Sequence, residues 1–210
     1  MYLCLGPKGS GKTLLLKRLQ KKEELDSMTS TVPTVGTNLV SLRFENQKEI
    51  MIREVGGTMA PIWKSYYNGV NKIMYVVDAS NLCQIPAAGV LLYSILAEPS
   101  LQKAKVLLVL TKMDVSYRQM RNEALLILQL SRLKKEISQE IIVVETSAMT
   151  GEGVSEILQW LQDTKNWMAS SSTTNNETPA ICSNFSAETT DTSTFSAETT
   201  DTSTFSAEKF

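Results

Sequence analysis

The stretch GPKGSGKT at residues 6–13 decides the fold class of this chain. It has the spacing G-x-x-x-x-G-K-[ST] of a phosphate-binding loop. The apolar run Tyr2 to Leu5 precedes it as a predicted strand, and Thr13 to Lys22 follows it as a predicted helix. Glycines let backbone N–H groups converge on a phosphate, and the helix turns its positive N-terminus toward the same point. The stretch therefore predicts binding of a nucleoside triphosphate, without indicating which base.

Two side chains of this loop have distinct expected roles. The Lys12 ammonium supplies a point charge to the β- and γ-phosphates and to the transition state of their cleavage, and the Thr13 hydroxyl can ligate Mg²⁺. The predicted nucleotide ligands from the loop are Gly6, Gly9, Ser10, Gly11, Lys12 and Thr13.

Outward from the loop, short apolar strands alternate with amphipathic stretches. Continuous Val, Ile and Leu strands separated by helices indicate a parallel sheet that is covered on both faces. A hairpin around Asn46-Gln47 adds one antiparallel edge strand. We therefore expect an α/β fold with a mostly parallel six-stranded sheet. The remaining predicted strands are 39–44, 50–54, 72–77, 106–110 and 141–144, and the remaining predicted helices are 87–96, 123–133 and 154–160.

Two polar loops follow predicted strands at the edge where ligands bind in open α/β sheets. In the first, Asp114 can accept hydrogen bonds from guanine N1–H and N2–H₂, a donor pair that adenine lacks. The Lys112 stem can pack over the base, and Thr111 can tie this loop to the phosphate loop. In the second, a backbone N–H near Ser147 and Ala148 can donate to guanine O6. Together with the phosphate loop, these segments predict guanine selectivity.

Two further segments carry groups suited to Mg²⁺ and the γ-phosphate. Thr34 lies before the hairpin and can bring its hydroxyl to Mg²⁺. Glu54 ends the hairpin and can hold Mg²⁺ through a water, while the Gly57 N–H can meet the γ-phosphate. Because these contacts exist only with the γ-phosphate present, the segments predict an order–disorder switch.

These motifs together resemble the Arf-like branch of the Ras-superfamily small GTPases, from Leu3 to about Trp167. The resemblance implies the P-loop small-GTPase fold, with GTP or GDP and Mg²⁺ as cofactors. It also implies effectors and regulators that bind the switch segments 33–38 and 54–67 in a GTP-dependent way, and often a role in membrane traffic or cilia. The branch is indicated by PTVGTN at 33–38 and by Pro61-Ile62-Trp63 with Tyr66-Tyr67.

The chain departs from the family pattern at the residue that orients the attacking water. Thr58 stands where the family carries Gln, and its side chain is shorter and has no amide. We expect a GTPase with slow intrinsic hydrolysis, in which no residue is a certain catalytic group. A nucleotide-bound scaffold that never cycles is the alternative. A nucleoside kinase is disfavoured, because we find no arginine-rich lid and because the loop of Lys112 and Asp114 argues against it.

Other departures change the expectations less. Glu54 is one methylene longer than the family Asp, so its contact with Mg²⁺ can be direct or through water. Thr111 replaces the commoner Asn, and Lys8 is expected to point to solvent. The aromatic residues Trp63, Tyr66 and Tyr67 can form either an effector surface or a support under the second switch.

Composition limits the partners and the location. A net charge of −1 disfavours bulk attraction to nucleic acid or anionic membranes, and the absence of histidine excludes His-based catalysis. Position 2 is Tyr and the last four residues lack Cys, so we expect no covalent lipid anchor. We expect a cytoplasmic monomer that reaches organelle membranes only through partners. We assign residues 1–168 to the GTPase domain, and we expect residues 169–210, with a ten-residue repeat, to be a disordered tail.

Overall fold

The computed structural model describes residues 1–21, 31–44 and 49–162. The expected tail at 169–210 and the expected hairpin turn at Asn46-Gln47 lie outside these residues. Among the described helices, none is both long and apolar enough to cross a bilayer.

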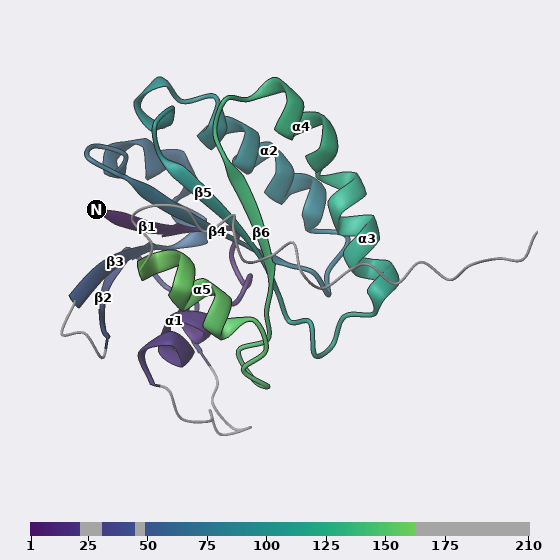
Figure 1. The fold of residues 1–210 in the computed structure, drawn as a ribbon, viewed down its shortest axis with the longest axis horizontal. Helices are drawn as coiled ribbons and strands as arrows, with labels where there is room; N and C mark the ends of the chain where they lie inside the picture. The colour runs from purple at the N-terminus through teal and green to yellow at the C-terminus, as the bar shows by residue number, and fades with distance from the viewer. Residues whose placement is uncertain (22–30, 45–48, 163–210) are drawn as a thin grey trace, which may run out of the picture. The chain divides into compact units, whose positions relative to one another are not determined.

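A six-stranded sheet forms the centre of the described domain, in the order β2-β3-β1-β4-β5-β6 (Figure 1). All neighbouring strands are parallel except β2 and β3, which pair antiparallel from Thr37 opposite Val55 to Arg43 opposite Glu49. The predicted sheet is thereby confirmed, including its one antiparallel edge strand. The strands are β1 Tyr2–Leu5, β2 Thr37–Arg43, β3 Glu49–Val55, β4 Lys72–Asp78, β5 Lys105–Thr111 and β6 Ile141–Glu145.

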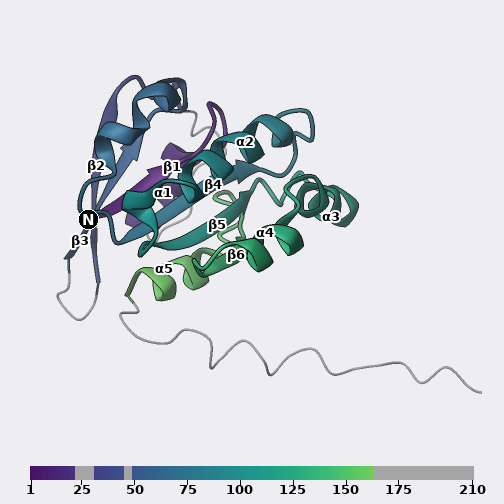
Figure 2. The ribbon, with the colours of Figure 1, turned by 90° about the horizontal axis from the view of Figure 1, so that it is seen from above.

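Helices cover both faces of the sheet (Figures 1 and 2). Successive strand side chains point to opposite faces, so Leu3 and Leu5 enter one core while Cys4 enters the other. The Cys4 core includes side chains of α1 Lys12–Gln20 and α5 Val154–Gln162. The opposite core includes side chains of α2 Ile85–Leu96, α3 Arg118–Ile127 and α4 Leu130–Glu136.

The single helix predicted over 123–133 is wrong, because the structure divides this region into α3 and α4 at Gln129. Gln129 adopts a left-handed conformation with φ 47° and ψ 38°. The break allows Leu128, Leu130 and Leu133 all to be buried, although they do not follow one helical stripe. Leu126, in contrast, is 77% exposed. Tertiary packing has therefore overridden the local helical pattern.

A 3₁₀ segment from Gly57 to Tyr66, which the sequence did not predict, follows β3, and a short one spans Pro99–Leu101. The sequence left open whether the aromatic residues here form an effector surface or a support under the second switch, and the structure decides this for two of the three. Trp63 and Tyr67 are 2% and 5% exposed in the core, whereas Tyr66 is only partly buried. The Trp63 indole N–H donates to the Gly56 carbonyl at 3.2 Å. Trp63 and Tyr67 thus pack in the core and anchor the second switch segment there.

Candidate nucleotide-binding site

The phosphate loop connects β1 to α1 and crosses close to β4. Gly6 has φ 149°, and a Cβ there would lie 2.2 Å from the Val76 carbonyl oxygen, so only glycine fits. Within the loop, the Lys12 ammonium donates to the carbonyls of Gly6 at 2.9 Å and Pro7 at 2.8 Å. Backbone geometry and one lysine therefore define the shape of the loop.

Lys12 is only 5% exposed, and this burial lowers the pKa of its ammonium group, against the opposing effect of the Glu54 charge. Ser10 is fully buried beside it, with its hydroxyl oxygen 3.4 Å from the Lys12 nitrogen. Lys8, two residues earlier than Ser10, is exposed, as the sequence predicted. Both lysines line the cavity described below, and Lys12 is the buried one.

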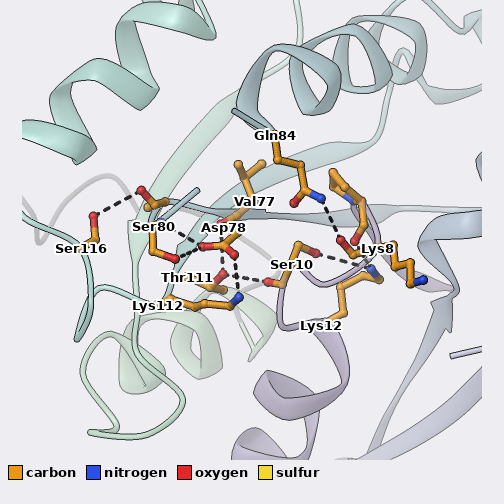
Figure 3. Close-up of polar contacts among 12 residues, drawn as sticks. Lys8, Ser10, Lys12, Val77, Asp78, Ser80, Gln84, Thr111, Lys112 and Ser116 are labelled. Atoms are coloured by element: carbon orange, nitrogen blue, oxygen red, sulfur yellow. Dashed lines mark hydrogen bonds and ion pairs between the residues drawn. The ribbon is translucent and has the colours of Figure 1, made fainter. Parts of the chain in front are cut away.

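Thr111, at the end of β5, ties the loop to the sheet (Figure 3). Its hydroxyl lies 2.8 Å from the Ser10 carbonyl oxygen and 3.0 Å from the Val77 carbonyl oxygen. The single hydroxyl proton is shared between these two acceptors, and Thr111 is 3% exposed, so the contact is shielded from water. Thr111 thus connects β4, β5 and the phosphate loop.

Lys112 pairs with Asp78, a residue to which the sequence reasoning gave no role. The Lys112 ammonium lies 2.6 Å from Asp78 Oδ2, and Asp78 Oδ1 accepts hydrogen bonds from the Ser80 N–H at 2.9 Å and hydroxyl at 2.6 Å (Figure 3). Asp78 is 4% exposed and ends β4 at the carboxyl edge of the sheet. The available signal was its position, because this acidic residue follows the apolar run 73–77 at the end of a strand. Asp78 fixes the direction of the Lys112 side chain.

Gln84 is a second residue that the sequence reasoning missed. It directly precedes α2, and its side-chain amide donates to the Lys8 carbonyl at 3.0 Å (Figure 3). This contact spans 76 residues of sequence, and no local pattern indicates it.

The two predicted base-reading loops lie together. The Ser147 hydroxyl donates to Asp114 Oδ1 at 2.6 Å, with Ser147 fully buried and Asp114 exposed. The backbone N–H of Thr146 donates to Leu110, and that of Ser147 donates to Glu152. The Ala148 N–H is therefore the candidate that remains for guanine O6. Ser147 also orients the carboxylate that is predicted to read the base.

Three oxygen-bearing side chains converge next to the loop. The Thr13 and Thr34 hydroxyls lie 2.9 Å apart, and each donates a hydrogen bond to Glu54 Oε1. Glu54 is fully buried, and its Oε2 is without a hydrogen-bond partner in the described part of the chain. A buried acceptor with spare capacity next to two hydroxyls fits a hard cation such as Mg²⁺. The described residues hold no cluster of three His, Cys, Asp or Glu, so a site here depends on the threonines.

The two switch segments contact each other and the phosphate loop. The Gly56 N–H donates to the Gly36 carbonyl at 2.9 Å. A Cβ on Gly57 would lie 2.2 Å from the Lys8 nitrogen, so this close approach requires glycine. Thr58 follows and is exposed.

A cavity of about 240 Å³ lies between the phosphate loop, both switch segments and Lys112. Among the residues of the site, its lining includes Lys12, Thr13, Thr34, Glu54 and Thr58. It also includes Thr31 and Val32, to which the sequence analysis gave no role. Asp114, Ser147 and Ala148 are not among the described residues that line this cavity.

The sequence is similar to a known protein family and to individual members of it. Residues 1–165 match the model of the ADP-ribosylation factor family. The human protein "ADP-ribosylation factor-like protein 16" is 39% identical over 170 residues, which cover 78% of this chain and 85% of that protein. ADP-ribosylation factor 3 of Arabidopsis thaliana is 33% identical over 164 residues, which cover 77% of this chain and 86% of that protein.

A solved structure has a similar fold. It is that of the Arl6 (BBS3) small GTPase of Trypanosoma brucei with the bound nucleotide analogue GppNp. The match has a TM-score of 0.65 at 20% sequence identity and covers 77% of this chain and 95% of the other. At 20% identity, this similarity is evidence for the fold alone.

Proposed function

The chain belongs to the ADP-ribosylation factor family of small GTPases, and from that premise we propose that it is a GTP-binding molecular switch with slow intrinsic hydrolysis. In this proposal it binds GTP or GDP together with Mg²⁺ and recruits effectors in the GTP state. The observation that supports it most is the convergence of Lys12, Thr13, Thr34 and Glu54 around one cavity.

The phosphate end of this cavity suits a triphosphate. Lys12 is buried and directed along the loop, so its charge would act on phosphate oxygens in a poorly solvated setting, where charge-assisted hydrogen bonds are strong. Mg²⁺, when bound, would supply the charge that offsets the β- and γ-phosphates. The residues that would hold the cation are Thr13, Thr34 and Glu54. Because Thr34 belongs to the segment 33–38, its contact with the cation would fix the position of that segment.

Guanine selectivity in this proposal comes from Asp114 and Ala148. The Ser147 hydroxyl holds one oxygen of the Asp114 carboxylate, which leaves the other oxygen for the two guanine donors. Lys112 is held by Asp78, so its aliphatic stem is fixed beside the cavity, where a base can pack on it.

Slow hydrolysis follows from Thr58. This residue lines the cavity and is exposed, but its side chain is shorter than that of Gln and has no amide, so its hydroxyl does not extend far enough to orient the attacking water. The same residue favours the second candidate, a nucleotide-bound scaffold that does not cycle. In both cases, partners would bind the switch segments 33–38 and 54–67, and contact with organelle membranes would come through those partners.

The guanine assignment can be tested with the full chain and a fluorescent GTP analogue. Unlabelled GTP should displace the analogue at far lower concentration than ATP or XTP. Asp114→Asn should reverse the preference between GTP and XTP, because xanthine carries an oxygen where guanine has its amino group. We expect GTP affinity to fall about 100-fold or more from the lost carboxylate contacts.

Glu156→Gln is the matched control, since it neutralises an exposed carboxylate on α5 and should leave both affinities unchanged. If Asp114→Asn binds GTP and XTP as the parent chain does, Asp114 does not read the base. The proposal of guanine selectivity would then be wrong.

A further inference from the structure

The two faces of the β2–β3 hairpin are covered to very different extents. On one face, Leu42 and Ile52 are buried in the core that also contains side chains of α1 and α5. On the other face, Leu39 and Met51 are 54% and 56% exposed, and they are diagonal neighbours across the two strands. The hairpin includes the terminal strand β2, at the opposite end of the sheet from β6 (Figure 1). Neighbouring exposed apolar side chains often mark a docking surface.

Arg53 lies between these two apolar residues and the covered part of the same face. It is opposite Leu39 of β2 and beside Leu3 of β1 in the register of the sheet. Met51 is two residues away on β3 and therefore shares this face, because strand side chains alternate. Leu3 is fully buried, whereas Leu39 and Met51 are exposed. Arg53 thus stands where the core on this face ends.

The guanidinium group of Arg53 has a ring contact but no carboxylate partner in the described part of the chain. Its Cζ lies 5.7 Å from the centre of the Tyr66 ring. Its Nε is buried without a hydrogen-bond partner, whereas its two terminal nitrogens are neither buried nor hydrogen-bonded within residues 1–21, 31–44 and 49–162. These terminal nitrogens are therefore open to an incoming acceptor.

The other charged side chains nearby have partners. Arg43 and Glu49 are opposite each other on the same face, with Arg43 Nε 3.8 Å from Glu49 Oε1. Lys64, on the 3₁₀ segment that follows β3, pairs with Glu98 at 3.1 Å. Arg53 therefore leaves one positive charge without a counter-charge among the described residues of this face.

We propose that Leu39, Met51, Arg53 and Tyr66, which we call the hairpin face, dock a segment of a partner protein in which apolar side chains flank a carboxylate. The carboxylate would bind the terminal nitrogens of Arg53, and the apolar side chains would cover Leu39 and Met51. Arginine and tyrosine are frequent energetic centres of protein interfaces, and a bond between arginine and a carboxylate is charge-assisted. The proposal rests on the proposed function, because it names the kind of partner that the switch recognises.

An anionic membrane is the other acceptor that an exposed arginine could meet. Membrane surfaces are recognised by clusters of basic residues, whereas the hairpin face offers one cation without a counter-charge. The net charge of the whole chain is −1. A protein segment fits the face better, because it supplies a single carboxylate together with apolar neighbours.

Peptides displayed on phage test this chemistry without a known partner. Short random peptides would be selected on the full chain loaded with GppNp and Mg²⁺, after removal of those that bind the Arg53→Gln chain. We expect the enriched peptides to share an Asp or Glu that is flanked by apolar residues. Exchange of this acid for its amide should weaken binding to the parent chain about tenfold, as expected for one charge-assisted contact.

Variants at two arginines of the same face test the location. Arg53→Gln should weaken the selected peptides about tenfold. Arg43→Gln is the matched control, because this arginine already has a partner, and it should change binding less than about twofold. A peptide with Lys in place of its acid should bind the Arg53→Glu chain better than the parent chain. With nitrogen-15 labelling, the peptides should shift the amide signals of 37–43 and 49–55.

Four results would overturn the proposal. They are a selection in which no peptide depends on Arg53, enriched peptides without an acid, amide shifts that lie elsewhere, and binding to phosphatidylserine vesicles that Arg53→Gln abolishes. The exchange of the peptide's acid uses the unmodified chain, so it remains decisive even if Arg53→Gln were to fold poorly. Equal binding of the peptides to the GDP and GppNp forms would support the hairpin face and contradict instead the GTP dependence in the proposed function.

Discussion

The phosphate loop and the switch pair, residues 33–38 with 54–58, meet at one cavity but are held in different ways. Contacts from three separate parts of the chain hold the phosphate loop, and those of Lys12 and Thr111 are buried. Lys12 bonds to two loop carbonyls, Thr111 bonds to Ser10, and Gln84 bonds to Lys8. The switch pair depends on the Thr13–Thr34–Glu54 cluster and on close contacts at two glycines. Val32 and Val35, which flank Thr34, are 84% and 93% exposed.

We call the phosphate loop the fixed surface, because its contacts do not need a ligand. We call the switch pair the conditional surface, because its contacts depend on what occupies the cavity. The hydrogen bonds of Thr111 and Gln84 go to backbone carbonyls of the loop rather than to a nucleotide or a cation, so we expect them to persist whatever occupies the cavity. The contacts of Thr34 and Glu54 are those that a cation would share. Loss of the cation and the γ-phosphate would therefore release the switch pair while the loop keeps its shape.

The largest expected effect is on the fixed surface. Lys12→Ala removes the buried ammonium that we expect on the phosphates, at a cost of about 2–4 kcal/mol, or roughly 30- to 1,000-fold in GTP affinity. Displacement of a fluorescent GTP analogue measures it. Lys8→Ala, which removes the exposed lysine of the same loop, should change affinity less than about threefold. Equal losses from both variants would mean that burial of Lys12 does not distinguish it.

A smaller effect is expected from the conditional surface. Thr34→Val keeps the side-chain shape but removes the hydroxyl that bonds to Glu54. Release of a GTP analogue in Mg²⁺ should accelerate about tenfold, as expected for one lost contact. The difference from the parent chain should vanish when a chelator removes Mg²⁺. Thr31→Val, an exposed neighbour in the cavity lining, is the control and should release at the parent rate. An acceleration that persists in the chelator would mean that Thr34 acts without the cation.

The smallest effect concerns the buried anchor of the second switch. Trp63→Phe retains an aromatic ring but loses the hydrogen bond to the Gly56 carbonyl. The free energy of unfolding should fall by about 1 kcal/mol, measured by urea denaturation followed by circular dichroism. Tyr66→Phe, which keeps the ring near Arg53, should change it by less than about 0.5 kcal/mol. A Trp63→Phe chain as stable as the parent would show that this hydrogen bond contributes nothing.

Sequence patterns predicted the sheet well because its signals are local. The apolar run at β1 predicted the observed bounds Tyr2–Leu5, and the alternation of strands and helices predicted that the strands are mostly parallel. The helix at 123–133 failed because burial of Leu128, Leu130 and Leu133 required a break at Gln129. The break lies against α2, where the Tyr93 hydroxyl donates to the Leu128 carbonyl, and a local stretch of sequence does not contain this contact.

At the candidate site, sequence reasoning identified residues by their chemical type but not their partners. Lys112 was expected beside a base, and the structure adds that Asp78 holds it from the neighbouring strand. Gln84 and Gln139 carry no motif, and only the folded chain shows which carbonyls they meet. The roles of Thr13, Thr34, Glu54 and Asp114 remain predictions for the experiments above.

The central claim, a switch that holds GTP and hydrolyses it slowly, is tested most directly by single-turnover hydrolysis in the Mg²⁺-loaded full chain, with and without Thr58→Gln. The account predicts slow production of GDP by the parent chain and a rate at least severalfold higher for Thr58→Gln, because the amide can orient the attacking water. A parent chain that hydrolyses GTP as fast as a Gln-bearing relative, with no gain from Thr58→Gln, would contradict it.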